Sequence, residues 1–256
     1  MKDIKIGGKI EASAISLGCM RMASLDEKDV DAIMNTAIEN GVTHFDHADI
    51  YGRGNSEKLF GAYLKRNKCA RDKMFIQTKC AIHDGQYDFS KEHVISSVEG
   101  SLSRLGIDYV DMLLLHRPDT LMEPEEVAEA FDILESSGKV LNFGVSNHNP
   151  MQINLLKTAV KQPIMANQLQ FSITESGMIT SGMNANMKNS ESVMHDGSVL
   201  EYSRINNITI QAWSPFQHGF FKGSYIDNDE FPELNKKNCR NRRKIRLDKD
   251  GCSISV

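Results

Sequence analysis

The chain has few cysteines, and they are scattered. There are five, an odd number, and no pair has the spacing of a metal-binding motif; they are Cys19, Cys69, Cys80, Cys239 and Cys252. This pattern is typical of free thiols in a reducing compartment. It argues against a small secreted domain held together by disulfides.

Long hydrophobic runs and a large net charge are also missing. The first residues, MKDIKIGGKIEAS, lack the apolar core of a signal peptide, and no apolar run approaches the ~20 residues of a membrane span. The formal net charge is only −4 at pH 7, which gives no reason to expect nucleic acid or an anionic membrane surface as a partner. We therefore expect a cytoplasmic protein with neither kind of partner.

What the chain does have is a regular alternation of short apolar runs with longer amphipathic ones. The short runs are almost continuously apolar, as expected for strands buried on both faces of a parallel sheet; they are Ile15–Gly18, Thr43–His47, Met74–Lys79, Tyr109–His116, Val140–Ser146, Ile164–Gln168 and Ile208–Trp213. Helical patterns lie between them, at Asp26–Asn40, Glu92–Leu105, Pro124–Ser137 and Pro150–Val160. Strand followed by helix, repeated in this way, predicts parallel βαβ units.

Two arrangements of these units remain open. A TIM barrel has about 250 residues and eight strands, whereas the 256 residues here supply seven strand patterns. A doubly wound open sheet usually carries G-x-G-x-x-G after a strand, and the segment GRGNSEKLFG keeps only Gly52 and Gly54 of that motif. The polar stretch Ser172–Asp196 is expected to be a long loop after the sixth strand.

Four polar residues stand at or just after the ends of predicted strands. Asp46 closes the second strand and Tyr51 follows it, Lys79 closes the third, and His116 closes the fourth. In a barrel, the carboxyl ends of the strands meet on one face and form the active site. Each residue alone has an ordinary structural explanation, such as a helix cap or a packing residue. Together they predict a catalytic site.

These residue types suit the reduction of a carbonyl group. A tyrosine hydroxyl has an ordinary pKa of about 10, and an adjacent ammonium is expected to lower the pKa of Tyr51. A carboxylate at Asp46 would keep Lys79 charged, and the imidazole of His116 could orient the carbonyl. An aldolase that forms a Schiff base through Lys79 is the distant alternative.

Several segments resemble the aldo-keto reductase family. They are GVTHFDHADIYGRGNSEKLFG (41–61), DMLLLHRPD, GKVLNFGVSNH, NQLQFS and IQAWSPF, and the first two are closest to a bacterial oxidoreductase subgroup. The resemblance covers about residues 4 to 238. It implies a (β/α)8 TIM barrel that reduces an aldehyde, ketone or dicarbonyl to an alcohol with hydride from NADPH, while NAD is not excluded. No metal takes part in that chemistry.

The resemblance also implies a role for each matching residue. Tyr51 would be the general acid, Asp46 and Lys79 would tune it, and His116 would orient the substrate. Trp213 would stack on the nicotinamide ring, and its alternative is core packing. The other cofactor-binding positions would be Gly18, Cys19 and Met20 at the ribose, Ser146, Asn147 and Gln168 at the carboxamide, and Ser214, Phe216 and Gly219 at the pyrophosphate.

The last residues depart from the family. From Cys239 the chain reads CRNRRKIRLDKDGCSISV, which is basic and lacks helical apolar spacing. A reverse translation read one base later gives TVEIAEKYGLTKTAVALA, an amphipathic pattern like the family's own continuation. We therefore expect an incomplete barrel over residues 1–238, its eighth strand missing, and an aberrant, frameshifted tail over 239–256; a genuinely divergent tail is the alternative. An unstable, non-catalytic product is accordingly the second functional hypothesis. The substrate and the oligomeric state are not readable from the sequence.

Overall fold

The computed structural model describes residues 1–67, 70–83, 85–184, 187–189, 198–215, 229, 232–233 and 235. The chain divides into two units. The first comprises Met1–Gln168 and Asp196–Ile210, and the second comprises Leu169–His195 and Gln211–Val256. The predicted site residues Phe216 and Gly219 lie outside the described residues, as do Cys69 and the tail from residue 236.

The sheet that positions the site has a strictly sequential strand order, β11-β10-β9-β8-β5-β4-β3. Its strands are β3 (Ser16–Gly18), β4 (His44–Asp46), β5 (Phe75–Cys80), β8 (Met112–Leu115), β9 (Phe143–Ser146), β10 (Ile164–Gln170) and β11 (Thr209–Trp213). The pairings from β3 through to β10 are parallel. A doubly wound sheet reverses its strand order at a switch point, and this sheet does not. The fold is therefore of the (β/α)8 barrel type, with seven strands among the residues described.

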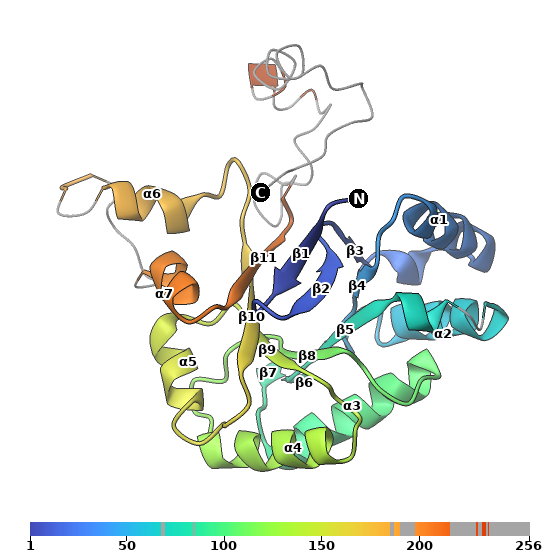
Figure 1. Cartoon of the computed structure of the whole chain (residues 1–256), viewed down its shortest axis with the longest axis horizontal. Helices are drawn as coiled ribbons and strands as arrows, with labels where there is room; N and C mark the ends of the chain where they lie inside the picture. Colours follow the sequence, from blue (N-terminus) through green and yellow to red (C-terminus); the bar gives the residue numbers. More distant parts are fainter. Residues whose placement is uncertain are drawn as a thin grey trace. The chain divides into compact units, whose positions relative to one another are not determined.

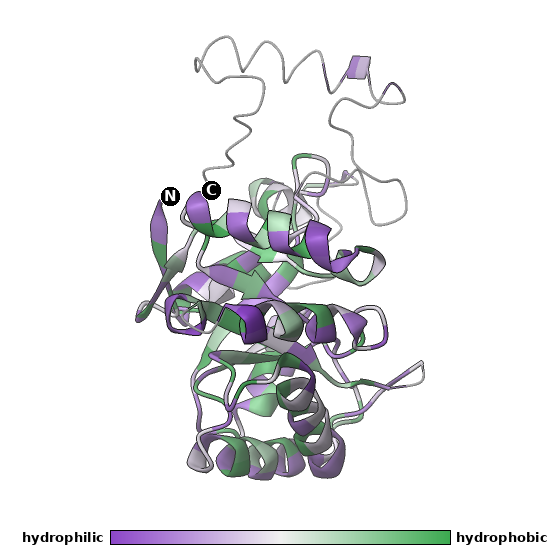
Figure 2. Cartoon of the chain, turned by 90° about the vertical axis from the view of Figure 1, so that its right-hand side faces the viewer, coloured by the Kyte–Doolittle hydropathy of each residue, from purple (hydrophilic) through white to green (hydrophobic). Residues whose placement is uncertain are grey.

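Helices cover the outer side of this sheet in the first unit (Figure 1). They are α1 (Glu27–Glu39), α2 (Asn55–Arg66), α3 (Lys91–Leu105), α4 (Pro124–Ser136), α5 (Pro150–Leu156) and α7 (Val199–Ile205), with short 3₁₀ turns η1 (Met22–Ser24) and η2 (Arg71–Lys73). In Figure 2 the helices carry both hydrophilic and hydrophobic residues, as expected for helices with one face on a sheet. The larger hydrophobic core, which includes Val30, Phe60, Val98 and Phe131, lies between these helices and the strands.

The helix boundaries follow the local signals in the sequence. Asp26 caps α1 by accepting a hydrogen bond from the Asp29 amide at 2.8 Å, and Gly106 ends α3 with a left-handed φ of 65°. Proline opens both α4 and α5, where its missing N–H costs no helical hydrogen bond. The four predicted helices are thus confirmed to within a few residues.

Two hairpins were not predicted. β1 (Asp3–Ile6) and β2 (Ile10–Ser13) pair antiparallel, and their Ile6 and Ala12 side chains join a second core with Phe75 and Met112 at the amino ends of β5 and β8. The hairpin thereby fills the inner side of the sheet at the end opposite the predicted site. A second hairpin, β6 (Ile82–His83) and β7 (Gln86–Tyr87), follows β5.

In the second unit, one prediction was wrong. The stretch Ser172–Asp196 is not simply a loop, because it contains helix α6 (Gly177–Met183). No residue of α6 is buried, so the segment had no need for the apolar periodicity by which a helix is recognised. Residues 185–186 and 190–196 of this stretch lie outside the described part.

Candidate active site

The four predicted catalytic residues lie together at the carboxyl ends of β4, β5 and β8. Asp46 is the last residue of β4, Lys79 is the penultimate residue of β5, and His116 directly follows β8. Tyr51 is brought back toward them by a tight turn, in which its amide donates to the Ala48 carbonyl at 3.1 Å. This geometry agrees with the prediction from the sequence that these side chains meet.

Glycine at position 52 permits that turn. Gly52 has a φ of 57°, and a Cβ added there would come within 2.1 Å of the Ala23 side chain. Both the left-handed backbone and the lack of space therefore require glycine next to Tyr51.

The Lys79 ammonium group is the centre of the cluster. It is fully buried and donates to three oxygens: Asp46 Oδ2 at 2.7 Å, the His47 carbonyl at 2.8 Å and Tyr51 Oη at 3.0 Å. Burial acts to lower the pKa of Lys79, but the attraction of Asp46 and Tyr51 outweighs it and the pKa is raised. Lys79 is therefore a charged group whose three N–H bonds are all engaged.

Asp46 is fixed by donors on both of its oxygens. Besides the ammonium on Oδ2, Oδ1 accepts from Gln77 Nε2 at 2.6 Å and from Gln168 Nε2 at 3.2 Å. Burial acts to raise the pKa of Asp46, yet the charge and hydrogen bond of Lys79 outweigh it and the pKa is lowered. The carboxylate thus stays ionised and holds the lysine in place. Gln77 was missed in the sequence, where the only signal was a polar residue inside an apolar strand.

The structure corrects the expected pKa of Tyr51. Lys79 does act to lower it, but burial of the phenol has the larger effect and the pKa of Tyr51 is raised. The sequence showed which charge would be near, but not how far the hydroxyl would be withdrawn from water. Tyr51 accordingly remains a protonated phenol, the form that can give a proton away.

His116 presents an uncharged imidazole beside the phenol. Its ring meets the Tyr51 ring edge-on, with centroids 5.9 Å apart and planes at 83°. Burial, followed by the charge of Lys79, lowers the pKa of His116 to about 3. Its Nδ1 is buried without a hydrogen-bond partner among the described residues. The ring is therefore a neutral group with an unused polar atom next to the proposed proton donor.

Three predicted cofactor residues gather beside this cluster. Asn147 Nδ2 donates to Ser146 Oγ at 2.8 Å and to the His116 carbonyl at 3.3 Å, and Ser146 Oγ donates to the Gln168 carbonyl at 2.9 Å. Asn147 has a positive φ of 60°, a strained backbone that the neighbouring hydrogen bonds hold in place. Hydroxyl and amide groups offer both donors and acceptors, as recognition of a carboxamide requires.

The residues that leave β3 also border the cluster. The Cys19 amide donates to the Asp46 carbonyl at 2.9 Å, and Gly18 pairs with Asp46 in the sheet register. The Cys19 side chain is buried, whereas Met20 is exposed. Of these three predicted cofactor residues, Gly18 and Met20 thus offer accessible surface.

The predicted aromatic residue belongs to the second unit. Trp213 ends β11, and its carbonyl accepts a hydrogen bond from the Phe171 amide at 3.4 Å. Ser214 follows with a positive φ of 54°. Their roles at the cofactor stay predictions.

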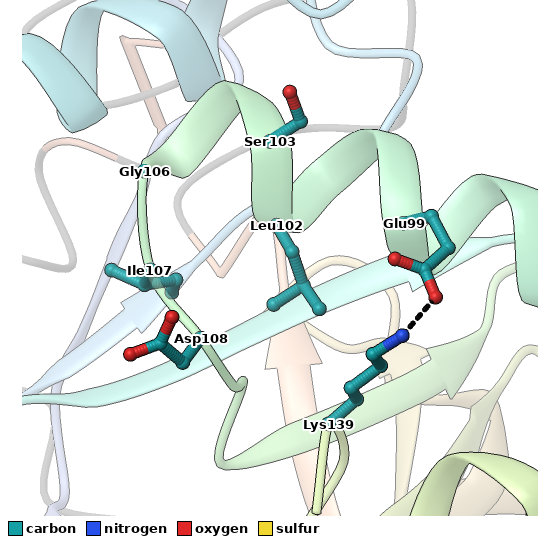
Figure 3. A pocket seen from close by; sticks show the side chains of 7 residues that line it. All are labelled: Glu99, Leu102, Ser103, Gly106, Ile107, Asp108 and Lys139. Carbon is teal, nitrogen blue, oxygen red and sulfur yellow. Dashed lines mark hydrogen bonds and ion pairs between the residues drawn. The ribbon is translucent and has the colours of Figure 1, made fainter. Parts of the chain in front are cut away.

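A separate hollow of about 320 Å³ lies at the opposite ends of the strands. Its lining comes from the end of α3 and the loop before β8, which marks the amino ends of the sheet. Figure 3 shows Lys139 reaching toward Glu99, with which it forms an ion pair. This hollow therefore belongs to the stability face of a barrel rather than to its chemistry.

His47 allows a test of the electrostatics around the site. Its side chain is fully buried, neither ring nitrogen has a hydrogen-bond partner in the described part of the chain, and its ring packs against Phe60 with centroids 4.4 Å apart. Burial, its largest cause, lowers the pKa of His47 to about 3. Because the unfolded histidine has a pKa of about 6.5, the unfolded state binds an extra proton between these values. The contribution of neutral His47 to stability is therefore complete above pH ~6.5. It is lost as the pH decreases from that value toward the folded-state pKa of about 3.

We expect His47→Leu to flatten that dependence. Leucine cannot take up a proton in the unfolded state. The slope of the free energy of unfolding against pH should therefore decrease by up to ~1.4 kcal/mol per pH unit below pH ~6.5. The backbone carbonyl of residue 47, which binds Lys79, remains. Urea unfolding across this range measures the slope. The two proteins should give parallel profiles above pH ~7.5, and unchanged slopes below it would contradict the assignment.

This chain has the barrel-type fold, with buried charged residues at the carboxyl ends of its strands. Enzymes of the (β/α)-barrel class have their active sites at that end. Within that class, the chain belongs to the aldo/keto reductase family, whose model matches residues 14–253. The chain is thus an oxidoreductase of a family that generally uses nicotinamide cofactors.

Relatives agree with this assignment. The chain is 36% identical over 241 residues to an uncharacterized oxidoreductase, YcsN, of Bacillus subtilis, covering 90% of this chain and 75% of the relative. It is 35% identical over 239 residues to a 6-dehydroglucose reductase of Agrobacterium fabrum, covering 88% and 75%. A crystal structure of a thermostable aldo-keto reductase with the inhibitor epalrestat has a TM-score of 0.73 at 24% identity, over 95% of this chain and 81% of that one. The last likeness concerns the fold alone.

No described helix is long and apolar enough to cross a membrane.

Proposed function

We propose that this chain reduces the carbonyl group of an aldehyde, ketone or dicarbonyl to an alcohol, with NADPH as the cofactor. The observation that supports this most directly is the Lys79 ammonium group, which holds Asp46 and Tyr51 at 2.7 and 3.0 Å. Substrates of this fold bind at the carboxyl ends of the strands, and a protonated phenol in that position supports the proposal.

The residues present fit a nicotinamide cofactor. The Ser146 hydroxyl and the Asn147 and Gln168 amides form a mixed set of donors and acceptors beside Asp46, which suits a carboxamide. Bound NADPH would supply the hydride, which goes to the carbonyl carbon.

The chain's own groups would handle the proton. Tyr51 Oη gives its proton to the carbonyl oxygen as negative charge develops there, and the Lys79 ammonium stabilises the tyrosinate that remains. The neutral His116 ring orients the carbonyl oxygen toward Tyr51. The product is an alcohol, and the phenol is restored by a proton from water.

The same geometry argues against an aldolase. A Schiff base requires an uncharged, accessible amine, whereas the Lys79 amine is fully buried, has a raised pKa and donates three hydrogen bonds.

Two measurements on the full chain test the proposal. NADPH should quench the fluorescence of Trp213, which is the single tryptophan, and NADPH absorbance should fall when a carbonyl substrate is added. Since one relative is named a 6-dehydroglucose reductase, a dehydro sugar is the substrate to test first, and NADH in parallel decides the cofactor. A folded sample that neither binds NADPH nor oxidises it with any carbonyl would overturn the proposal in favour of a non-catalytic product.

A further inference from the structure

Two histidines and an aspartate come together beside the loop that follows β5. His83 ends β6, Asp88 follows β7, and His93 lies in the first turn of α3 (Figure 1). One possible ligand atom from each residue lies within 4.8 Å of those of the other two. The three residues therefore converge from a hairpin and a helix, and none of them belongs to the hydrogen-bonded cluster around Lys79.

The shape of the cluster suits a single ion. The two imidazole rings are neighbours, with centroids 5.0 Å apart and planes at 39°. Ligands on one tetrahedral zinc ion at about 2.0–2.1 Å lie roughly 3.4 Å from each other. His83 is exposed and the other two are half-buried, so rotation of the side chains on binding would close the remaining distance.

The charge states are those of metal ligands. Burial acts to raise the pKa of Asp88, but hydrogen bonds from Ser90 and the nearby histidines outweigh it and the pKa is lowered. Burial, as the largest cause, lowers the pKa of His93. The positive end of the helix dipole also disfavours a second proton on a histidine in the first turn of α3. The site thus offers an ionised carboxylate and a neutral imidazole near pH 7.

Neighbouring groups restrain the side chains of Asp88 and His93. The Ser90 amide donates to Asp88 Oδ1 at 2.9 Å, and Ser97 Oγ lies 3.4 Å from His93 Nε2. Groups of this kind orient the ligands in metal sites and raise their affinity.

We propose that His83, Asp88 and His93 bind a divalent transition-metal ion, such as zinc or cobalt, outside the catalytic cluster. Two imidazoles and a carboxylate favour such ions over magnesium or calcium, which take oxygen ligands. Solvent would complete the coordination on the exposed side. The bound ion would join the β6–β7 hairpin to the amino end of α3. Its ligand His83 lies four residues after Lys79 along the chain.

Titration of the full chain with Co²⁺, followed by displacement with Zn²⁺, tests the site. One Co²⁺ per chain should bind with visible absorption, but without the near-ultraviolet charge-transfer band of a thiolate ligand. That band distinguishes this site from one made by cysteines. A Co²⁺ complex dominated by the thiolate band would overturn the proposal.

Variants assign the ligands. His83→Ala and His93→Ala should each weaken binding by at least ~10-fold, the lower end of the effect of losing even a supporting group. Asp88→Asn keeps an oxygen that can accept the Ser90 hydrogen bond but loses the charge, and should also weaken it. Glu92→Gln, which removes an exposed carboxylate one residue from His93, is the matched control and should bind normally.

Circular dichroism of each variant confirms that it is folded, and His83→Gln provides a second change at the most exposed ligand. Unchanged Co²⁺ affinity in folded His83→Ala and His93→Ala would overturn the proposal. Because Co²⁺ binding is measured without substrate or NADPH, it remains informative even if carbonyl reduction fails its own test.

Discussion

Replacing Tyr51 by phenylalanine should lower kcat by about 10²–10⁴-fold, the usual contribution of a positioned general acid. The variant loses only the hydroxyl oxygen that lies 3.0 Å from Lys79 Nζ. The ring and its edge-on contact with His116 remain, so the packing of the cluster is kept. Without the phenol, the carbonyl oxygen loses the proton donor that the proposed mechanism assigns to it.

Stopped-flow or steady-state oxidation of NADPH measures the loss, and quenching of Trp213 shows whether the cofactor still binds. Cofactor affinity should stay close to that of the unaltered chain. Tyr63→Phe is the matched control. The Tyr63 hydroxyl donates a hydrogen bond of 2.8 Å to Asn35 and does not belong to the cluster around Lys79, so its removal should leave kcat unchanged. Near-normal turnover in Tyr51→Phe would sink the assignment of the acid.

Replacing Arg104 by methionine should lower the free energy of unfolding by about 3–5 kcal/mol, the cost of leaving a buried charge without its partner. Glu57 is fully buried on α2 and accepts from Arg104 Nε at 2.7 Å and from Thr78 Oγ1 at 2.7 Å. Since the Arg104 side chain is itself 24% exposed, the lower end of the range is expected. The pair connects α2, α3 and β5, the strand that carries Lys79.

Urea unfolding of two further variants separates charge from packing. Arg66→Met removes an arginine whose ion pairs with Glu27 and Asp31 are exposed, and it should cost no more than ~1 kcal/mol. Adding Glu57→Gln to Arg104→Met should recover part of the loss, because the amide is neutral and can still accept from Thr78. Equal losses for Arg66→Met and Arg104→Met would contradict the role of the buried charge.

The strands and the meeting of the residues around Lys79 could be predicted from the sequence for related reasons. Parallel strands are buried on both faces, so β5 and β8 stand out as apolar runs, and a charged residue at the end of such a run is conspicuous. Lys79 and His116 were found in this way. The β1–β2 hairpin was missed because its four-residue strands are too short to show a period, and α6 was missed because it buries nothing.

Other features depend on distances in the fold that no local pattern encodes. The pKa of Tyr51 is decided by the balance between burial and the ammonium group, and its direction was therefore predicted wrongly. The approach of His83 and His93 depends on a hairpin that was itself unpredicted. The change of reading frame near Asn238 stays a prediction, because residues 236–256 lie outside the described part.

The sequential strand order also bears on how the protein emerges from the ribosome. From β3 to β9, each strand of this sheet pairs with the strand of the same sheet that was made before it, so the sheet can grow as the chain is synthesised. Asp46, Tyr51, Lys79 and His116 are all made before residue 117, whereas Ser146, Asn147 and Trp213 come later. A ribosome that stops partway would therefore release a chain that already carries the residues proposed for proton transfer but lacks those proposed to hold the nicotinamide carboxamide and ring.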